Sequence, residues 1–190
     1  MRKVNGSFLI AATVASGVLW AATIELRRPL PKHLATTEPS DRAALILPLQ
    51  VDAAAFRQLQ QELTADRIDV RMQPTNTNEA EKPLAVLVDA SQIVRLIVPL
   101  DPAGGTIPAA VTNAARQWAA GRDAFVTHCG HCHGDDGLET TYANIKTMKA
   151  ISTRLTDQKI LDGAAEFGAV EVSSWSPQQR ADLLLFIRGL

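Results

Sequence analysis

The stretch GRDAFVTHCGHCHGDDG, residues 121–137, holds both cysteines of the 190-residue chain and three of its four histidines. Within it, Cys129, Cys132 and His133 form the pattern C-x-x-C-H, and residues three and four apart share one face of a helical turn. Such a cluster pairs its thiols in a disulfide, coordinates a metal ion, or holds a prosthetic group. These three outcomes imply different folds for the surrounding chain.

The C-x-x-C-H pattern is typical of covalent haem attachment. The thiols of Cys129 and Cys132 can add to the two vinyl groups of one porphyrin, and His133 is then carried under the iron as an axial ligand. The sequence therefore predicts one covalent haem c. Cys129, Cys132 and His133 are its binding residues, and His133 is a ligand of the metal.

Zinc, a redox-active thiol pair and a structural disulfide are the alternatives. A zinc site takes four ligands, whereas Cys129, Cys132 and either His131 or His133 supply three, at a spacing that gives poor tetrahedral geometry. A thioredoxin-like pair needs a βαβ setting, but the flanking sequence has a helical pattern. A disulfide between the two cysteines would close a short, strained loop.

The stretch also resembles a known family. Five residues have the spacing with which class I cytochromes c begin: Gly121, Phe125, Cys129, Cys132 and His133. In that family the glycine and the aromatic residue lie on an N-terminal helix that crosses the C-terminal helix closely, and Leu183 and Phe186 would pack there. The resemblance, over about residues 112–190, implies an electron-transfer domain on the outer face of a bacterial inner membrane.

An apolar run without a charged residue occupies residues 4–24. As a helix it would extend about 32 Å, enough to cross a hydrocarbon core of about 30 Å. Residues 1–26 are therefore interpreted as a transmembrane anchor, with a cleaved signal peptide as the alternative, and residues 27–40 as a tether. The expected location is the bacterial inner membrane, single-pass, with the soluble part on the periplasmic side.

Residues 41–100 have the pattern of a small α+β domain. Apolar residues cluster or alternate in four expected strands: 43–50, 68–72, 84–89 and 92–98. A helix is expected from its N-cap, Asp52, to about Thr64. Because this segment contains neither cysteine nor histidine, we expect a docking module rather than a catalytic one, followed by a linker at 101–111.

Residues 112–190 are expected to be a mostly α-helical cytochrome c domain. A short helix is expected over 155–163, with Thr156 as its cap and Gly163 as its stop. The last helix opens with Ser176-Pro177-Gln178-Gln179, which has a cap, a proline at the first position and a glutamine three residues after the cap. The predicted fold class is thus mostly α, preceded by a transmembrane helix and the small α+β domain.

The sixth iron ligand is where the family pattern breaks. The family usually supplies a methionine from the loop before the last helix, but residues 164–175 contain neither methionine nor histidine. Met148, the only methionine after the haem motif, is the predicted distal ligand, with apolar packing as its alternative role. Other candidate ligands are Met72, His33, Lys146, Lys149 or a partner subunit, and the position can also be open.

The formal net charge of −1 and the lack of a basic patch argue against nucleic acid as a partner. The sequence predicts an electron carrier rather than an enzyme, tethered as a subunit of a respiratory or photosynthetic oxidoreductase complex. Its expected partners are the inner membrane, the other subunits and a second electron carrier. The alternative function is a haem-based gas sensor or small redox enzyme with an open sixth position.

Overall fold

The computed structural model divides the chain into two compact units, Met1–Thr112 and Asn113–Leu190. It describes residues 42–73, 83–90, 93–100, 107–137, 147–166 and 172–190. Each unit has its own set of buried apolar side chains.

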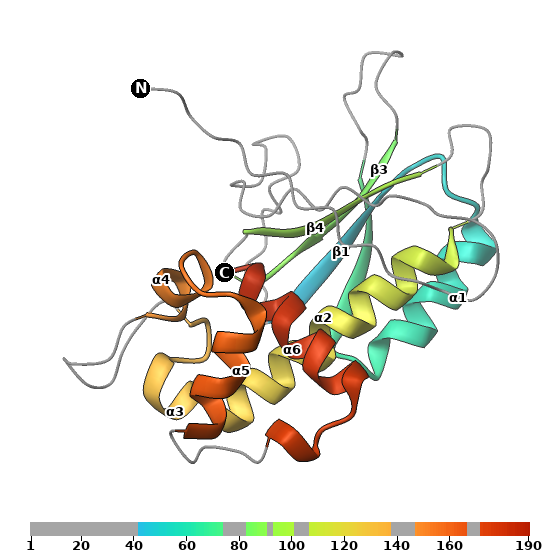
Figure 1. Ribbon diagram of the computed structural model, residues 1–190. Helices are drawn as coiled ribbons and strands as arrows, with labels where there is room; N and C mark the ends of the chain where they lie inside the picture. The colour runs from blue at the N-terminus through green and yellow to red at the C-terminus, as the bar shows by residue number, and fades with distance from the viewer. Residues whose placement is uncertain (1–41, 74–82, 91–92, 101–106, 138–146, 167–171) are drawn as a thin grey trace, which may run out of the picture. The chain divides into compact units, whose positions relative to one another are not determined.

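The first unit is built on a four-stranded mixed sheet (Figure 1). Its strands, in the spatial order β2-β1-β3-β4, are β2 (Ile68–Gln73), β1 (Ala43–Pro48), β3 (Leu84–Val88) and β4 (Val94–Pro99). Helix α1 (Ala53–Thr64) connects β1 to β2, which pair in parallel because the crossover returns the chain in the same direction. Strand β3 is antiparallel to both β1 and β4.

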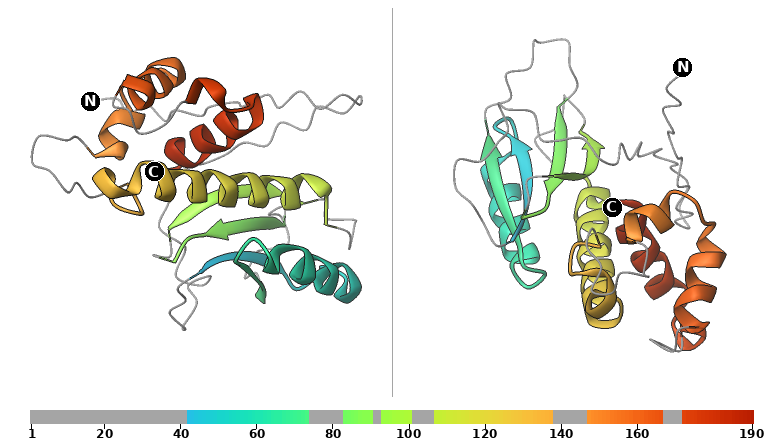
Figure 2. Two further views of the ribbon diagram at one scale, coloured as in Figure 1. Left: turned by 90° about the horizontal axis from the view of Figure 1, so that it is seen from below. Right: turned by 90° about the vertical axis from the view of Figure 1, so that its left-hand side faces the viewer.

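Strand β1, in the interior of the sheet, is buried on both of its faces. Side chains alternate between the faces of a strand, yet every residue of β1 is buried. Helix α1 lies over one face (Figure 2), and its own buried residues are Leu59 and Leu63. The connection from β3 to β4 is fixed by Asp89, which accepts from the backbone N–H of Ile93 at 2.9 Å and from Nε of the buried Arg95 at 2.7 Å.

The structure corrects the predicted fold class. A mostly α protein with a membrane-spanning helix is wrong, because strands β1 to β4 form a four-stranded mixed sheet. Among the residues that the structure describes, no helix has both the length and the apolar character needed to cross a membrane. The predicted single-pass inner-membrane location is corrected by the same finding, and the apolar run at 4–24 lies outside the described residues.

The individual strands and the first helix were predictable, whereas their assembly was not. The four expected strands correspond to β1–β4, and the helix capped by Asp52 is α1. The fold class was misjudged because the apolar N-terminal run and the helical C-terminal pattern are strong local signals. The mixed sheet depends on pairing between segments that are distant in the chain, which local patterns do not specify.

The second unit is helical and contains α2 through α6. Its elements are α2 (Ala109–His128, which begins just before the unit boundary), α3 (Gly130–His133), α4 (Met148–Ser152), α5 (Asp157–Glu166), the short 3₁₀ helix η1 (Val172–Ser174) and α6 (Pro177–Arg188). Helices α2 and α6 approach closely at Gly121, where an added Cβ would lie 1.9 Å from the backbone oxygen of Asp182. On either side of this contact, Phe186 meets Trp118 and Phe125, with ring centroids 5.8 and 5.1 Å apart.

Two predictions about helix ends have different outcomes. The predicted cap of α6 is confirmed, because the Ser176 hydroxyl accepts from the Gln179 N–H and the Gln179 side chain accepts from the Ser176 N–H. The predicted stop at Gly163 is wrong, because α5 continues to Glu166. A glycine inside a helix costs about 1 kcal/mol relative to alanine, which neighbouring turns can tolerate.

Candidate functional site

Cys129, Cys132 and His133 lie on a single turn directly after α2. The N–H of Cys129 donates to the Phe125 carbonyl at 2.7 Å, which completes the last turn of α2. The N–H groups of Cys132 and His133 then both donate to the Cys129 carbonyl, at 3.2 and 3.0 Å. The three side chains that the sequence singled out are therefore brought together by one helical turn.

Both thiols are free and partly exposed, so no disulfide links them. Burial, and to a smaller extent the neighbouring Cys132, raises the pKa of the Cys129 thiol to about 11. At neutral pH Cys129 is therefore a protonated thiol, which is a weak nucleophile. His133 is half-buried, and its Nδ1 atom is shielded from solvent.

A glycine turn follows the three side chains and packs against the core of the second unit. Gly134 and Gly137 have φ angles of 71° and 69°, a left-handed conformation that favours glycine. A Cβ added to Gly137 would lie 2.5 Å from Cδ1 of Leu190 and 3.3 Å from both Cβ of Met148 and Cζ of Phe125. The positive φ angle at Gly137 and its close contacts with the core both favour glycine at this position.

Met148 is buried within this same core. It is the first residue of α4, it is 6% exposed, and it packs beside Gly137 near Phe125 and Leu190. Met148 therefore packs against apolar side chains in this structure. Ligation of iron by Met148 stays a prediction.

The other candidate ligands are dispersed. Lys149 is exposed on α4, and Met72 is half-buried on β2 in the first unit. His33 and Lys146 lie outside the described residues. The structure therefore singles out no replacement for Met148 among the residues that it describes.

His128 is half-buried, and its ring lies against Trp175. The two ring centroids are 5.2 Å apart, and the rings are tilted by 59°. The contact joins the last residue of α2 to the segment that precedes α6. Because the two residues are distant in the chain, no local pattern predicts that they meet.

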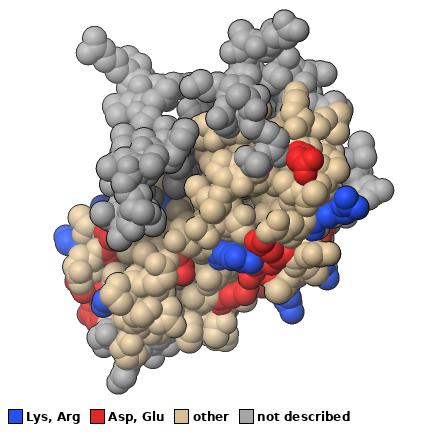
Figure 3. Space-filling model, turned by 90° about the vertical axis from the view of Figure 1, so that its right-hand side faces the viewer, with Lys and Arg blue, Asp and Glu red and all other residues tan. Residues whose placement is uncertain are grey.

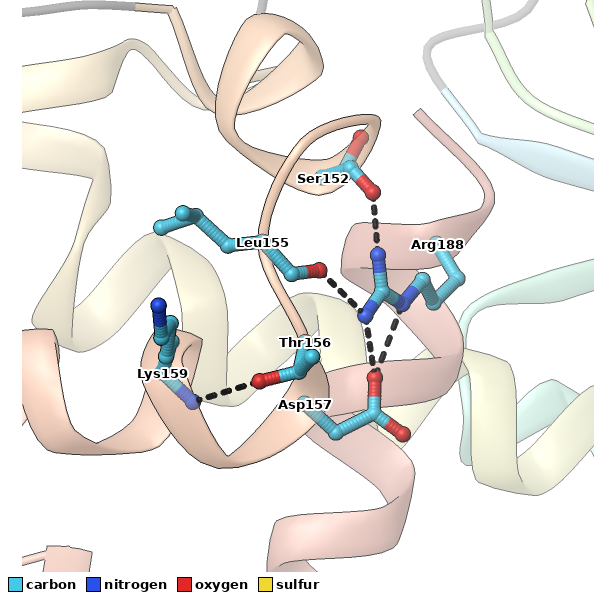
Figure 4. Close-up of polar contacts among 6 residues, drawn as sticks. All are labelled: Ser152, Leu155, Thr156, Asp157, Lys159 and Arg188. Atoms are coloured by element: carbon cyan, nitrogen blue, oxygen red, sulfur yellow. Dashed lines mark hydrogen bonds and ion pairs between the residues drawn. The ribbon is translucent and has the colours of Figure 1, made fainter.

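Sequence reasoning also missed Arg188, which ties the connection between α4 and α5 to α6 (Figure 4). Its guanidinium donates to the carbonyls of Ser152 and Leu155, the latter at 2.8 Å, and its Nε donates to Asp157 Oδ1 at 2.8 Å. An arginine in the last turn of a helix is common, so its presence in the sequence does not indicate this contact. The contact fixes the position of the segment that follows Met148.

In the ranges that the structure describes, no group of three or more His, Cys, Asp or Glu side chains could hold a metal ion. The zinc alternative, which needs such a group, has no support there. The structure therefore corrects two parts of the prediction. Among the described residues it contains neither a membrane-spanning helix nor a group of side chains that could hold a metal ion by themselves. A haem makes a different demand, because the porphyrin itself supplies ligands to the iron.

Comparisons with models of protein families, with curated proteins and with solved structures find no match to this chain. The chemistry of the site therefore has to be argued from its own residues. Two free thiols and an imidazole on one turn fit the attachment of a haem. The close contact of α2 and α6 at Gly121 is the arrangement that the resemblance to class I cytochromes c implies.

Proposed function

We propose that this protein transfers single electrons through one covalently attached haem c. The observation that carries the proposal is the grouping of Cys129, Cys132 and His133 on one helical turn, with both thiols free. Thioether bonds from the two cysteines would hold the haem, and His133 would ligate the iron. The bound iron supplies reversible one-electron oxidation and reduction.

The surroundings of the motif support this assignment. Phe125 lies one turn before Cys129 and is fully buried, and Gly137 brings the following turn against it. An apolar core therefore adjoins the turn that carries the two cysteines and the histidine. Burial is one of the factors that set the potential of a haem iron.

The individual side chains would hold and orient the haem. Cys129 and Cys132 fix the position of the group relative to α2, and His133 follows directly so that its imidazole is presented from the same turn. A redox partner among the subunits of an oxidoreductase, and a second electron carrier, stay predictions. The proposal requires one donor and one acceptor of single electrons, and it identifies neither.

One observation favours a second function, that of a gas sensor or small redox enzyme. Met148 is 6% exposed and packs in the core beside Gly137. If Met148 remains in this core when haem is bound, the sixth position of the iron is open unless another group fills it. An open position binds small gases or supports chemistry.

The test is the optical spectrum of the purified, dithionite-reduced protein before and after addition of carbon monoxide. Three proteins are compared: wild type, Met148→Ala and Met72→Ala, which removes the other candidate methionine ligand. The electron-carrier proposal predicts a wild-type spectrum that carbon monoxide leaves unchanged, and a response in Met148→Ala alone if that residue is the ligand. A wild type that binds carbon monoxide directly would favour the sensor or enzyme.

A further inference from the structure

We propose that the cleft between α1 and β2 is a binding site for a small organic molecule that carries a doubly charged oxyanion, such as a phosphate group. The cleft has a volume of about 520 Å³. The residues that carry the argument are Arg42, Arg57, Gln60, Gln61, Asp69 and Arg71. The site belongs to the first unit and is independent of the proposed haem.

Secondary structure explains why these polar side chains converge. Arg57, Gln60 and Gln61 are three and four residues apart on α1, so they share one face of that helix. Asp69 and Arg71 alternate with the buried Ile68 and Val70 on β2, so they share one face of that strand. Nε2 of Gln60 donates to the Val70 carbonyl at 3.4 Å and joins the two elements.

The charges in the cleft do not balance. Among the residues that the structure describes, three guanidinium groups, those of Arg42, Arg57 and Arg71, line the cleft together with one carboxylate, that of Asp69. The formal charge of the lining is therefore 3 − 1 = +2, which a dianion would neutralise. Arginine suits this task because its five N–H donors form a fixed fork that matches phosphate and carboxylate oxygens.

Asp69 competes with a ligand for the guanidinium groups of the cleft, but it holds them weakly. Its two oxygens lie 4.0 Å from a terminal nitrogen of Arg42 and 3.3 Å from one of Arg71. These are long contacts between groups that are a quarter to a half exposed, and such pairs are weak. A dianion can therefore displace Asp69 from both guanidinium groups.

The volume of the cleft argues for more than a bare ion. A single phosphate would leave most of 520 Å³ unfilled, and sites for small organic molecules have volumes of roughly 300–1,000 Å³. Gln60 and Gln61 add amide groups that can bind hydroxyl or carbonyl groups of such a molecule. On the face drawn in Figure 3, basic and acidic side chains lie next to one another, which differs from the broad basic surface that binds a polyanion.

Isothermal titration calorimetry of the full-length protein at low ionic strength tests this proposal. The probes are inorganic phosphate, pyrophosphate, glycerol phosphate and citrate. We expect saturable binding with one site per chain and at least a tenfold loss of affinity in both Arg57→Met and Arg71→Met. Asp69→Asn should tighten binding several-fold, because it removes the competing carboxylate. Thermal melting of each variant confirms that it is folded.

Arg154→Met is the matched control, because it removes one exposed arginine from the second unit. It should leave the affinity unchanged. An equal loss in Arg154→Met, or no saturable heat with any of the four probes, would overturn the proposal. If glycerol phosphate or citrate binds at least tenfold more tightly than inorganic phosphate, the organic ligand is supported. Equal affinities for all probes would contradict the organic ligand.

Discussion

Gly121 determines how closely α2 and α6 can approach each other. A Cβ at this position would lie 1.9 Å from the Asp182 carbonyl oxygen and 2.6 Å from its carbon, both of which belong to the backbone of α6. Backbone atoms cannot move aside as the end of a flexible side chain can, so an added methyl group must push the helices apart. Gly163 on α5 has no such neighbour within 4 Å.

We predict opposite effects for the same substitution at these two glycines. Gly121→Ala should lower the free energy of unfolding by about 1–3 kcal/mol, because it overpacks the contact between the helices. Gly163→Ala should raise it by about 0.5–1 kcal/mol, because alanine is the better helix former and has open space. Denaturant unfolding followed by circular dichroism measures both. A Gly121→Ala protein as stable as the wild type would contradict the close contact.

At the scale of elements, the start of α1 depends on the carboxylate of Asp52. One carboxylate oxygen accepts from the N–H groups of Ala54 and Ala55 at 2.8 and 3.0 Å. The hydrogen bond from Ala55, followed by that from Ala54, lowers the pKa of Asp52 below its usual 3.8. The cap is therefore fully effective above the usual pKa and is lost as the pH falls through the lowered value.

Asp52→Ala should lower the melting temperature by a few degrees at pH 7, because the two N–H groups lose their acceptor. The difference from wild type should shrink as the pH falls through the lowered pKa of Asp52, because the wild-type carboxyl then becomes protonated as well. Asp52→Asn is the control, since asparagine caps a helix as well as aspartate but does not titrate. A destabilisation by Asp52→Ala that is independent of pH would be inconsistent with a cap made by the charged group.

The second element-scale contact is the attachment of the α4–α5 connection to α6 by Arg188. Arg188→Met should lower the free energy of unfolding by about 1.5–3 kcal/mol, because the carbonyls of Ser152 and Leu155 lose a charged donor. Asp157→Asn should cost less than about 1 kcal/mol, because Asp157 is exposed and surface ion pairs contribute little. Chemical denaturation of both variants distinguishes the two contributions, and equal losses would show that the ion pair dominates.

Helix caps and single strands could be predicted because their signals are local. The order Ser176-Pro177-Gln178-Gln179 specifies a helix start without reference to the rest of the chain, and the structure contains that cap. Gly163 shows the limit of the same reasoning, because a glycine ends a helix in one context and lies within it in another. The outcome depends on whether flanking turns are stabilised by packing, which the local sequence does not reveal.

The candidate site was predictable from the sequence only where its members are close in the chain. Cys129, Cys132 and His133 lie within five residues, and the structure places them on one turn. Arg42, Arg57 and Arg71 are far apart in sequence and meet because the start of β1, helix α1 and strand β2 lie side by side. The contact of His128 with Trp175 has the same origin, since it requires the end of α2 and the start of α6 to meet.

At the scale of the whole molecule, the chain combines two units with different chemistry. The first has a mixed sheet with an arginine-lined cleft, and the second has a helical core beside two free thiols and a histidine. The proposed haem and the proposed anion site are therefore separable. Loss of Cys129 and Cys132 should abolish haem attachment and leave the calorimetric binding of the anionic probes unchanged.

The most direct test of the haem proposal is the intact mass of the purified protein after extraction with acidified acetone. The protein is produced in cells that carry haem-attachment machinery, as wild type and as the Cys129→Ser/Cys132→Ser double variant. The proposal predicts a wild-type mass equal to the polypeptide plus one haem, retained through denaturation, and a bare polypeptide for the double variant. A wild type with the mass of the bare polypeptide, or an added mass that persists in the double variant, would contradict it.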